Sequence, residues 1–182
     1  MSLEPQIKVA ALAGRRIDEP DSTRIQFPLT CVKKVSADLR KLFETGRFTS
    51  LVCSAACGAD LVAVESAKLL GMTIDIVLPY SPSKFRESSV VDRPGEWGPS
   101  YDRLIDETAA NKRLHILNSD EEGNYDLATK GILNVATSMA PLESIIGVVV
   151  WEGKPRDKGD ATLDFKRRAE KLGLKVHEVA TC

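Results

Sequence analysis

Short apolar runs alternate with amphipathic segments along the whole chain, and this alternation limits the possible folds more than any other feature. Six runs have the composition of buried strands, at residues 7–13, 50–54, 73–78, 113–117, 143–151 and 174–179. The most apolar of them contains IIGVVVW and is typical of a central strand that is buried on both faces. Five segments between them, at 27–45, 59–70, 101–110, 125–139 and 161–172, place apolar residues three and four apart, as helices do.

A chain in which strands and helices alternate folds as a parallel sheet with helices on both faces. We therefore expect an α/β protein: a single Rossmann-like domain over residues 1–182 with three layers, α/β/α, around a mostly parallel sheet of about six strands. The stretch 80–99 breaks the pattern, since Ser, Pro, Gly and charged residues dominate it. We predict a long loop there, and a loop of this length is often functional, for example as a lid. A surface excursion that only links the strand to the next helix is an equal alternative.

In sheets of this kind, ligands bind outside the carboxyl ends of the strands. Gly14, Arg15 and Arg16 follow the first strand, where a glycine lets a ligand approach and an arginine fork suits phosphate or carboxylate. A solvated loop with two charges is the alternative interpretation.

The second strand leads through small residues directly into a helix. Such a helix start presents unpaired N–H groups and a positive dipole end, to which a phosphate can dock. Asp60 has two interpretations, as a partner of a ribose hydroxyl or as a stabiliser of the first helical turn. Cys57 is more simply interpreted as a packed thiol than as a reactive one. The candidate ligand contacts in this turn are Ser54, Ala55, Cys57, Gly58, Ala59 and Asp60.

A second glycine-containing turn opens the last helix, after the fifth strand. Asp160 or Thr162 can cap that helix, which is a structural role. Two such turns facing one crevice indicate a cleft for a nucleotide or a sugar phosphate, although neither G-x-G-x-x-G nor a P-loop occurs. The ligand contacts expected here are Gly153, Gly159, Asp160, Ala161 and Thr162. Those expected from the ends of the third and fifth strands are Pro79, Tyr80, Phe85, Arg86 and Trp151. The aromatic rings of Tyr80, Phe85 and Trp151 are candidates for stacking on a base.

Charge and cysteine content exclude other classes of protein. With 25 Lys and Arg against 26 Asp and Glu, and with both signs mixed in the loops at the strand ends, the chain lacks the basic excess of a nucleic-acid binder. No apolar run is long enough to cross a membrane and no leader pattern is visible, so we expect a cytoplasmic protein. The four cysteines form no C-x-x-C pair; we expect reduced thiols, no metal site and no cofactor. The helices at 27–45 and 125–139 are candidate surfaces for a homo-oligomer.

The order of these pieces resembles the SLOG superfamily, which includes the LOG-like (lysine-decarboxylase-like) proteins and the Rossmann-like domain of DNA-processing protein A. The resemblance rests on GRR at 14–16, SAACGAD at 54–60, LP at 78–79 followed by an aromatic residue, and VVVWEG followed by GDAT. It implies a nucleotide-binding domain that could serve as a sensor of an NAD-derived or other nucleotide.

The departures from that family concern its hydrolytic motif. LOG phosphoribohydrolases carry P-G-G-x-G-T-x-x-E, whereas this chain has DKGDATLDF, with Phe165 where the acid is expected. Binding of a nucleotide is therefore the favoured function. The alternative is an N-glycosidase acting on nucleoside monophosphates, in which a carboxylate stabilises an oxocarbenium-like centre; the candidates are Asp60, Glu152, Asp160 and Asp164. Binding of single-stranded DNA is the third and weakest hypothesis.

Overall fold

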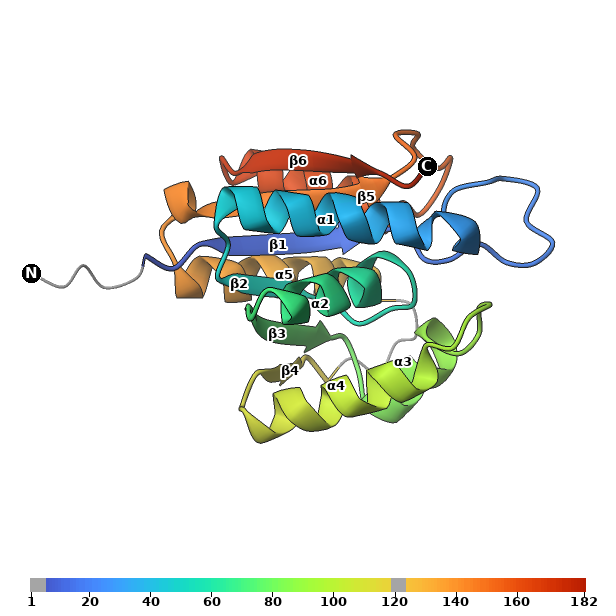
Figure 1. Ribbon diagram of the computed structural model, residues 1–182, viewed down its shortest axis with the longest axis horizontal. Helices are drawn as coiled ribbons and strands as arrows, with labels where there is room; N and C mark the ends of the chain where they lie inside the picture. The colour runs from blue at the N-terminus through green and yellow to red at the C-terminus, as the bar shows by residue number, and fades with distance from the viewer. Residues whose placement is uncertain (1–5, 119–123) are drawn as a thin grey trace, which may run out of the picture.

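The computed structural model describes residues 6–118 and 124–182, and its centre is a sheet of six parallel strands (Figure 1). Neighbouring strands follow the order β4-β3-β2-β1-β5-β6, and every pair of neighbours is parallel. The strands are β1 (Val9–Gly14), β2 (Ser50–Cys53), β3 (Thr73–Leu78), β4 (Leu114–Ile116), β5 (Ile145–Trp151) and β6 (Lys175–Ala180). This confirms the α/β class and the Rossmann-like parallel sheet.

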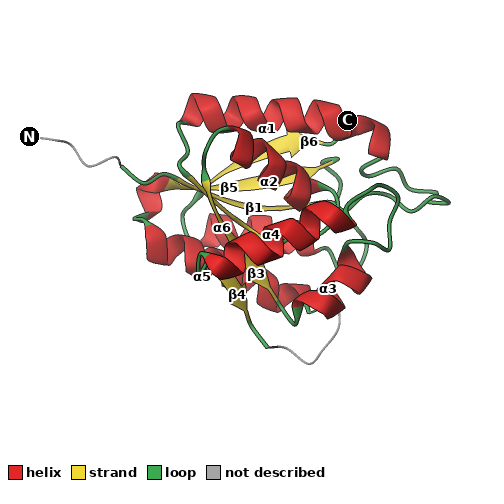
Figure 2. Cartoon of the chain, turned by 60° about the horizontal axis from the view of Figure 1, so that its bottom comes forward, coloured by secondary structure: helices red, strands yellow, loops and turns green. Residues whose placement is uncertain are grey.

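Helices cover both faces of the sheet, which gives three layers (Figure 2). One face carries α1 (Val32–Gly46), α2 (Ala59–Leu69) and α4 (Gly98–Ala110), and the other carries α5 (Tyr125–Met139) and α6 (Ala161–Lys171). Short 3-10 turns at Leu29–Cys31 and Leu142–Ser144 precede α1 and β5. Alternate residues of β1 enter the two cores, as the period of a strand requires: Ala10 and Leu12 pack on one face, Val9 and Ala11 on the other.

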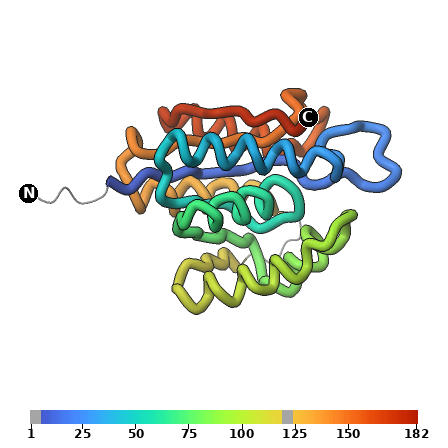
Figure 3. The backbone as a smooth tube through the Cα atoms, viewed as in Figure 1, coloured from blue at the N-terminus to red at the C-terminus, as the bar shows by residue number. Residues whose placement is uncertain are grey.

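The chain reverses its direction across the sheet after β4. From β1 it proceeds outward through β2 and β3 to the edge strand β4, then α5 carries it back so that β5 pairs with β1 (Figure 3). A crevice forms where strand order reverses in this way, outside the carboxyl ends of the two strands concerned. The place to look for a ligand is therefore above the ends of β1 and β5.

One glycine at this edge allows two elements to approach each other closely. A Cβ atom on Gly14 would lie 2.4 Å from the Cβ of Ala59 and 2.7 Å from the carbonyl oxygen of Val150. Any side chain at position 14 would therefore push the start of α2 away from the end of β1. The glycine keeps the two together and leaves the space above them open.

The prediction of an irregular loop over residues 80–99 is wrong for much of that stretch. Residues Pro82–Ser89 form the helix α3, with proline in its first turn, where a missing N–H costs nothing. Phe85 and Ser89, four residues apart, are buried, and the Cys57 amide donates to the Ser89 carbonyl at 3.0 Å. The helix α4 then begins at Gly98, three residues earlier than predicted.

The expectation of four reduced cysteines is also wrong. Cys31 and Cys182 form a disulfide with their Cα atoms 5.7 Å apart, while Cys53 and Cys57 are free and buried. The two partners are 151 residues apart in the sequence, and only the folded chain brings the end of β6 beside the start of α1.

No helix within residues 6–118 and 124–182 combines the length and apolarity that crossing a membrane requires.

Candidate functional site

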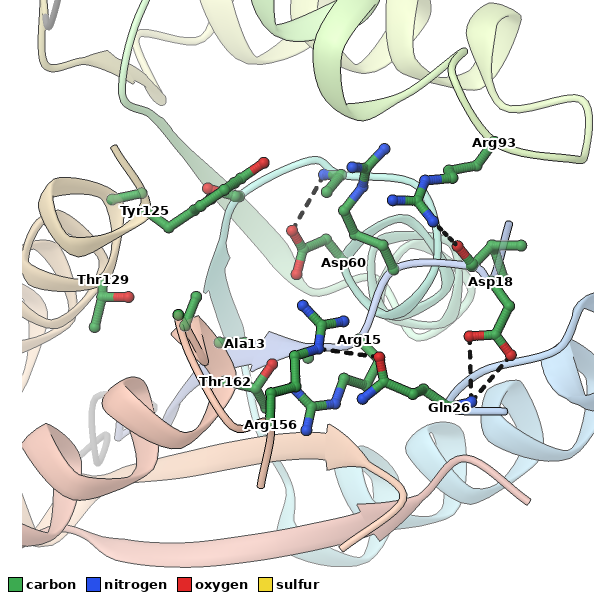
Figure 4. A pocket seen from close by; sticks show the side chains of 18 of the residues that line it. Ala13, Arg15, Asp18, Gln26, Asp60, Arg93, Tyr125, Thr129, Arg156 and Thr162 are labelled. Carbon is green, nitrogen blue, oxygen red and sulfur yellow. Dashed lines mark hydrogen bonds between the residues drawn. The ribbon is translucent and has the colours of Figure 1, made fainter. Parts of the chain in front are cut away.

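A cavity of about 280 Å³ opens at the carboxyl edge of the sheet, above the end of β1 and between the segments that follow β2 and β5 (Figure 4). Its wall combines the turn after β1, the loop 17–26, the first turns of α2, α5 and α6, and one residue each from α3 and the segment that follows it. The cavity therefore lies where the reversal of strand order places it.

Asp60 is the buried carboxylate among the described residues that line this cavity; Asp18 and Glu19 also line it but are more exposed. Asp60 stands in the first turn of α2 and is 8% exposed, and its Oδ2 accepts a hydrogen bond from the Ala56 amide at 3.1 Å. Within the described part of the chain its other oxygen, Oδ1, has no hydrogen-bond partner. Burial raises the pKa of Asp60 to about 7, against the opposing effects of the Ala56 amide and the charge of Arg16. This carboxyl group can exchange a proton near neutral pH.

Gly58 holds the turn before Asp60 against the end of β1. Its φ of 106° suits glycine, and a Cβ there would lie 2.7 Å from the Arg15 carbonyl oxygen. That carbonyl accepts from the Ala59 amide at 3.0 Å, and the Cys57 carbonyl accepts from the Ile17 amide at 3.4 Å. The amides of Ala56, Cys57 and Ala59 are thus used inside the protein, so this turn places Asp60 but does not offer those amides to a phosphate.

The guanidinium group of Arg15 holds other parts of the protein together and is not free to bind a ligand. Its side chain is buried, and its three nitrogens donate to the carboxylates of Glu152 and Asp160 at 2.6–3.3 Å and to the Lys154 carbonyl at 2.8 Å. This fork ties the end of β1 to the loop after β5 and to the start of α6. Arg15 borders the cavity, but its charge is already balanced.

The same network explains the state of Asp160. It caps α6 by accepting from the Leu163 amide at 3.1 Å, and it also accepts from the Arg156 amide at 2.8 Å. Although burial opposes ionisation, the hydrogen bonds from Arg15 and these two amides lower the pKa of Asp160 to about 2. Burial likewise opposes ionisation of Glu152, but the hydrogen bonds from Arg15 and Gln26 lower its pKa. Both groups are anchored anions.

The start of α6 offers hydrogen-bond donors that the protein does not use. In the described ranges, the amides of Ala161 and Thr162 have no acceptor, and the hydroxyl of Thr162 has no partner although the residue is only 4% exposed. Both residues line the cavity, and Figure 4 shows the Thr162 hydroxyl directed toward it. Because α6 also directs its positive dipole end here, the position suits an anion.

Three arginines border the cavity in addition to Arg15. Arg16 pairs with Asp92 and contacts the Cys57 sulfur at 3.7 Å, and its buried Nε has no partner in the described chain. Arg93 pairs with Glu19 at 2.9 Å. Arg156 donates from Nε to the Gln26 side chain at 3.0 Å, and its terminal nitrogens bond to nothing within the described residues. Burial and the like charge of Arg15 lower the pKa of Arg156, so an anion placed between them would relieve the repulsion.

The prediction from sequence missed the contribution of α5. Tyr125 and Thr129, one turn apart, line the cavity opposite Asp60 in Figure 4. Thr129 is 4% exposed, and its hydroxyl has no hydrogen-bond partner in the described residues. Strand order explains this position: α5 leads the chain back to β5 beside β1, so its first turns lie over the crevice, and no local pattern in the sequence shows that order.

Of the predicted site residues, fewer than half line the cavity. Those that do are Gly14, Arg15, Arg16, Ser54, Asp60, Phe85, Gly159, Ala161 and Thr162. Those that do not are Ala55, Cys57, Gly58, Ala59, Pro79, Tyr80, Arg86, Trp151, Gly153 and Asp160, together with the carboxylates of Glu152 and Asp164. Residues that line it without having been predicted are Ala13, Ile17, Asp18, Glu19, Ser22, Gln26, Ala56, Arg93, Tyr125, Ala128, Thr129, Ile132 and Arg156.

Several of these departures have plain physical causes. Tyr80 and Trp151 are buried and already contact other side chains: the Tyr80 ring packs at 5.8 Å from that of Phe85, and Arg15 and Lys166 each lie 5.5 Å from the centre of the Trp151 ring. Arg86 points elsewhere and pairs with Asp102 at 2.7 Å.

Two of the smaller polar candidates are likewise accounted for. Burial raises the pKa of the Cys57 thiol, which fits packing and not reactivity. The hydroxyl of Ser54 is occupied, because it donates to the Val77 carbonyl at 2.6 Å.

Comparison with known proteins assigns the chain to no family. No family model matches the chain, and no curated protein matches it. Among solved structures, DNA processing protein A from Streptococcus pneumoniae is similar at 14% identity and a TM-score of 0.45, over 96% of this chain and 59% of that protein. The chain thus spans about three fifths of the length of that protein.

Proposed function

We propose that this protein binds a nucleotide or a nucleotide-derived small molecule in the cavity at the carboxyl edge of the sheet. The observation that carries the proposal is the unused donor set at the start of α6: the amides of Ala161 and Thr162 and the Thr162 hydroxyl. A phosphate is the ligand group that best matches two amides and a hydroxyl at a positive helix end. The resemblance of the sequence to SLOG domains is consistent with this assignment.

The charges around the cavity favour the same ligand. Arg156 and Arg16 each keep guanidinium nitrogens without a partner in the described chain, and both line the cavity with the α6 donors. Asp60 and the anchored anions keep the local net charge low. A small anion held by oriented donors suits this arrangement better than a polyanion, which needs a continuous basic surface.

The size of the cavity limits the ligand. Its volume of about 280 Å³ lies at the small end of ligand sites, which span roughly 300–1,000 Å³. A mononucleotide fits this scale, whereas a dinucleotide would extend out of the cavity.

The test is a thermal-shift and calorimetric screen with AMP, GMP, CMP, UMP, ADP-ribose and NAD. A nucleotide at 100 times its dissociation constant adds about 2.7 kcal/mol of stability, so the melting temperature should rise by roughly 5–10 °C. Arg156→Gln should weaken binding about tenfold, while Arg167→Gln, an exposed arginine of α6 outside the cavity, should not. A flat response to every compound would reject the proposal.

A second candidate function is hydrolysis of the N-glycosidic bond of a nucleoside monophosphate. It is favoured by one observation, namely that Asp60 alone among the four candidate carboxylates faces the cavity, with a pKa of about 7. A carboxyl group of that pKa can donate a proton to a leaving base at neutral pH. Release of free base, followed by chromatography and lost in Asp60→Asn, would support hydrolysis; binding without release would leave the protein a binding module.

A further inference from the structure

Two cavity side chains outside the donor set assigned to phosphate belong to buried residues and keep an unpaired oxygen in the described chain. They are Asp60, from α2, and Thr129, from α5, which are 8% and 4% exposed. In the described residues neither Asp60 Oδ1 nor the Thr129 hydroxyl has a hydrogen-bond partner. Among the described residues, Arg16 Nε is the only fully buried side-chain polar atom without a partner, so these two oxygens are reached from the cavity, where a ligand can contact them.

The two side chains come from helices on opposite faces of the sheet. Both reach the space above the end of β1, where Ala13 and Gly14 contribute almost no side-chain volume to the wall (Figure 4). A ligand group bridging them would therefore lie directly above the sheet edge. The small residues leave room for a ring there.

We propose that Asp60 and Thr129 form a subsite for the vicinal diol of a ribose, so that the cavity selects ribonucleotides over 2′- or 3′-deoxyribonucleotides. This inference rests on the proposed function, because it assumes that the phosphate occupies the start of α6. It adds the identity of the sugar and the two residues that recognise it.

The chemistry of the two groups matches a diol. An ionised carboxylate only accepts hydrogen bonds, and a hydroxyl both donates and accepts. A ribose hydroxyl can donate to Asp60 while a neighbouring one exchanges a hydrogen bond with Thr129, and each side chain then gains a protein–ligand hydrogen bond. A base matches these two groups less well, because a base needs a flat apolar surface on which to stack. Tyr125, which lines the cavity and is 37% exposed, is better placed to receive a base.

The experiment compares AMP with 2′-deoxy-AMP and 3′-deoxy-AMP by calorimetry on the full chain, with ribose 5-phosphate and 2-deoxyribose 5-phosphate as probes without a base. A lost hydrogen bond to a charged group lowers affinity about 10- to 100-fold, so at least one deoxy analogue should bind that much more weakly than AMP. Ribose 5-phosphate should show the same preference over its deoxy form.

Variants assign the discrimination to residues. Thr129→Val keeps the shape of the side chain and should bring the ratio of AMP to deoxy-AMP affinity toward one; Asp60→Asn should do the same. The controls are Thr137→Val, on the same helix with a hydroxyl bonded to the Leu133 carbonyl at 2.9 Å, and Asp164→Asn on α6. Both controls should preserve the ratio.

The outcomes separate the two proposals. If AMP binds and both deoxy analogues bind equally well, the diol subsite is wrong while nucleotide binding stands. If discrimination exists but persists in both Thr129→Val and Asp60→Asn, other residues read the sugar and the inference is again wrong. If none of the phosphate-bearing probes binds, the proposed function fails and the subsite fails with it.

Discussion

Asp60 and Asp160 are two buried aspartates at the same edge of the sheet, each in or beside the first turn of a helix, yet their carboxyl groups are opposite in character. Asp160 accepts hydrogen bonds from Arg15 and two amides, and its pKa is about 2. Asp60 accepts one bond from an amide, and burial raises its pKa to about 7. Burial acts in the same direction on both, so the number of donors decides the difference.

The comparison separates groups that hold the site together from groups that are free to act in it. The carboxylates of Asp160 and Glu152 both form ion pairs with Arg15, and these ion pairs join β1 to α6 and to the loop that precedes it. Asp60 keeps an oxygen for a ligand, and the folded protein bears the energetic cost of burying it. Unsatisfied, shifted carboxyl groups of this kind concentrate at functional sites.

The largest effect should come from breaking the anchored side. Asp160→Ala removes the α6 cap and leaves the Arg15 guanidinium short of a partner, and loss of one partner from a buried pair costs about 3–5 kcal/mol. Urea unfolding measures this loss. Asp164→Ala, an exposed aspartate of the same helix, should change stability by no more than about 0.5 kcal/mol; equal losses in both variants would contradict the anchoring role.

Asp60→Asn should instead stabilise the protein. Below pH 4 the carboxyl is protonated in both states and the variant gains nothing. Between about pH 4 and 7 the folded state holds a proton that the unfolded state has released, so the stability of the original protein falls as pH rises. Above pH 7 the difference is complete, on the order of 4 kcal/mol. Unfolding midpoints at pH 4, 6 and 8 test the sign, and a variant less stable than the original at pH 8 would contradict it.

Arg15→Lys tests what keeps Asp160 ionised. A lysine supplies one ammonium group where the guanidinium fork holds two carboxylates, so stability should fall by about 1–3 kcal/mol. The pKa of Asp160 should rise from about 2 toward its ordinary value of 3.8, whereas that of Asp60 should not change. Carboxyl ¹³C NMR titration reports both groups at once. An unchanged Asp160 pKa would mean that the backbone amides alone are sufficient.

The smallest effect should come from Thr162→Val. Its hydroxyl has no partner in the described chain, so removing it should change stability by less than about 0.5 kcal/mol while weakening nucleotide binding. Thr181→Val is the matched control, because that buried hydroxyl donates to the Gln26 carbonyl and its loss should cost about 1 kcal/mol. A large loss of stability in Thr162→Val would mean that the hydroxyl has a structural role.

The sequence predicts the architecture well because the apolar pattern is local. The strands and the principal helices lie close to their expected positions. The exception is α3, where a stretch of Ser, Pro and charged residues conceals two buried positions, Phe85 and Ser89, spaced one helical turn apart. The prediction followed the polar composition of residues 80–99 and overlooked the helical spacing of the two buried residues.

The site was less predictable because its roles depend on distant partners. Nothing near Arg15 in the sequence indicates that carboxylates 137 and 145 residues away neutralise it. The amides of Cys57 and Ala59 could not be recognised as occupied, since their acceptors lie in other elements. The position of α5 over the crevice follows from strand order, which no local pattern contains.

The Cys31–Cys182 disulfide turns residues 31–182 into a covalent ring, and this has a mechanical consequence. A force applied at residues 6 and 182 passes through residues 6–31 and the sulfur bridge, so the ring itself bears no tension. Fully stretched, that path measures roughly 90 Å, against roughly 600 Å for the chain after reduction. In an optical trap the oxidised protein would bear the pull only along residues 6–31, which include β1 and one part of the cavity wall. Strands β2 to β6 would stay outside the line of pull until a reductant opened the ring.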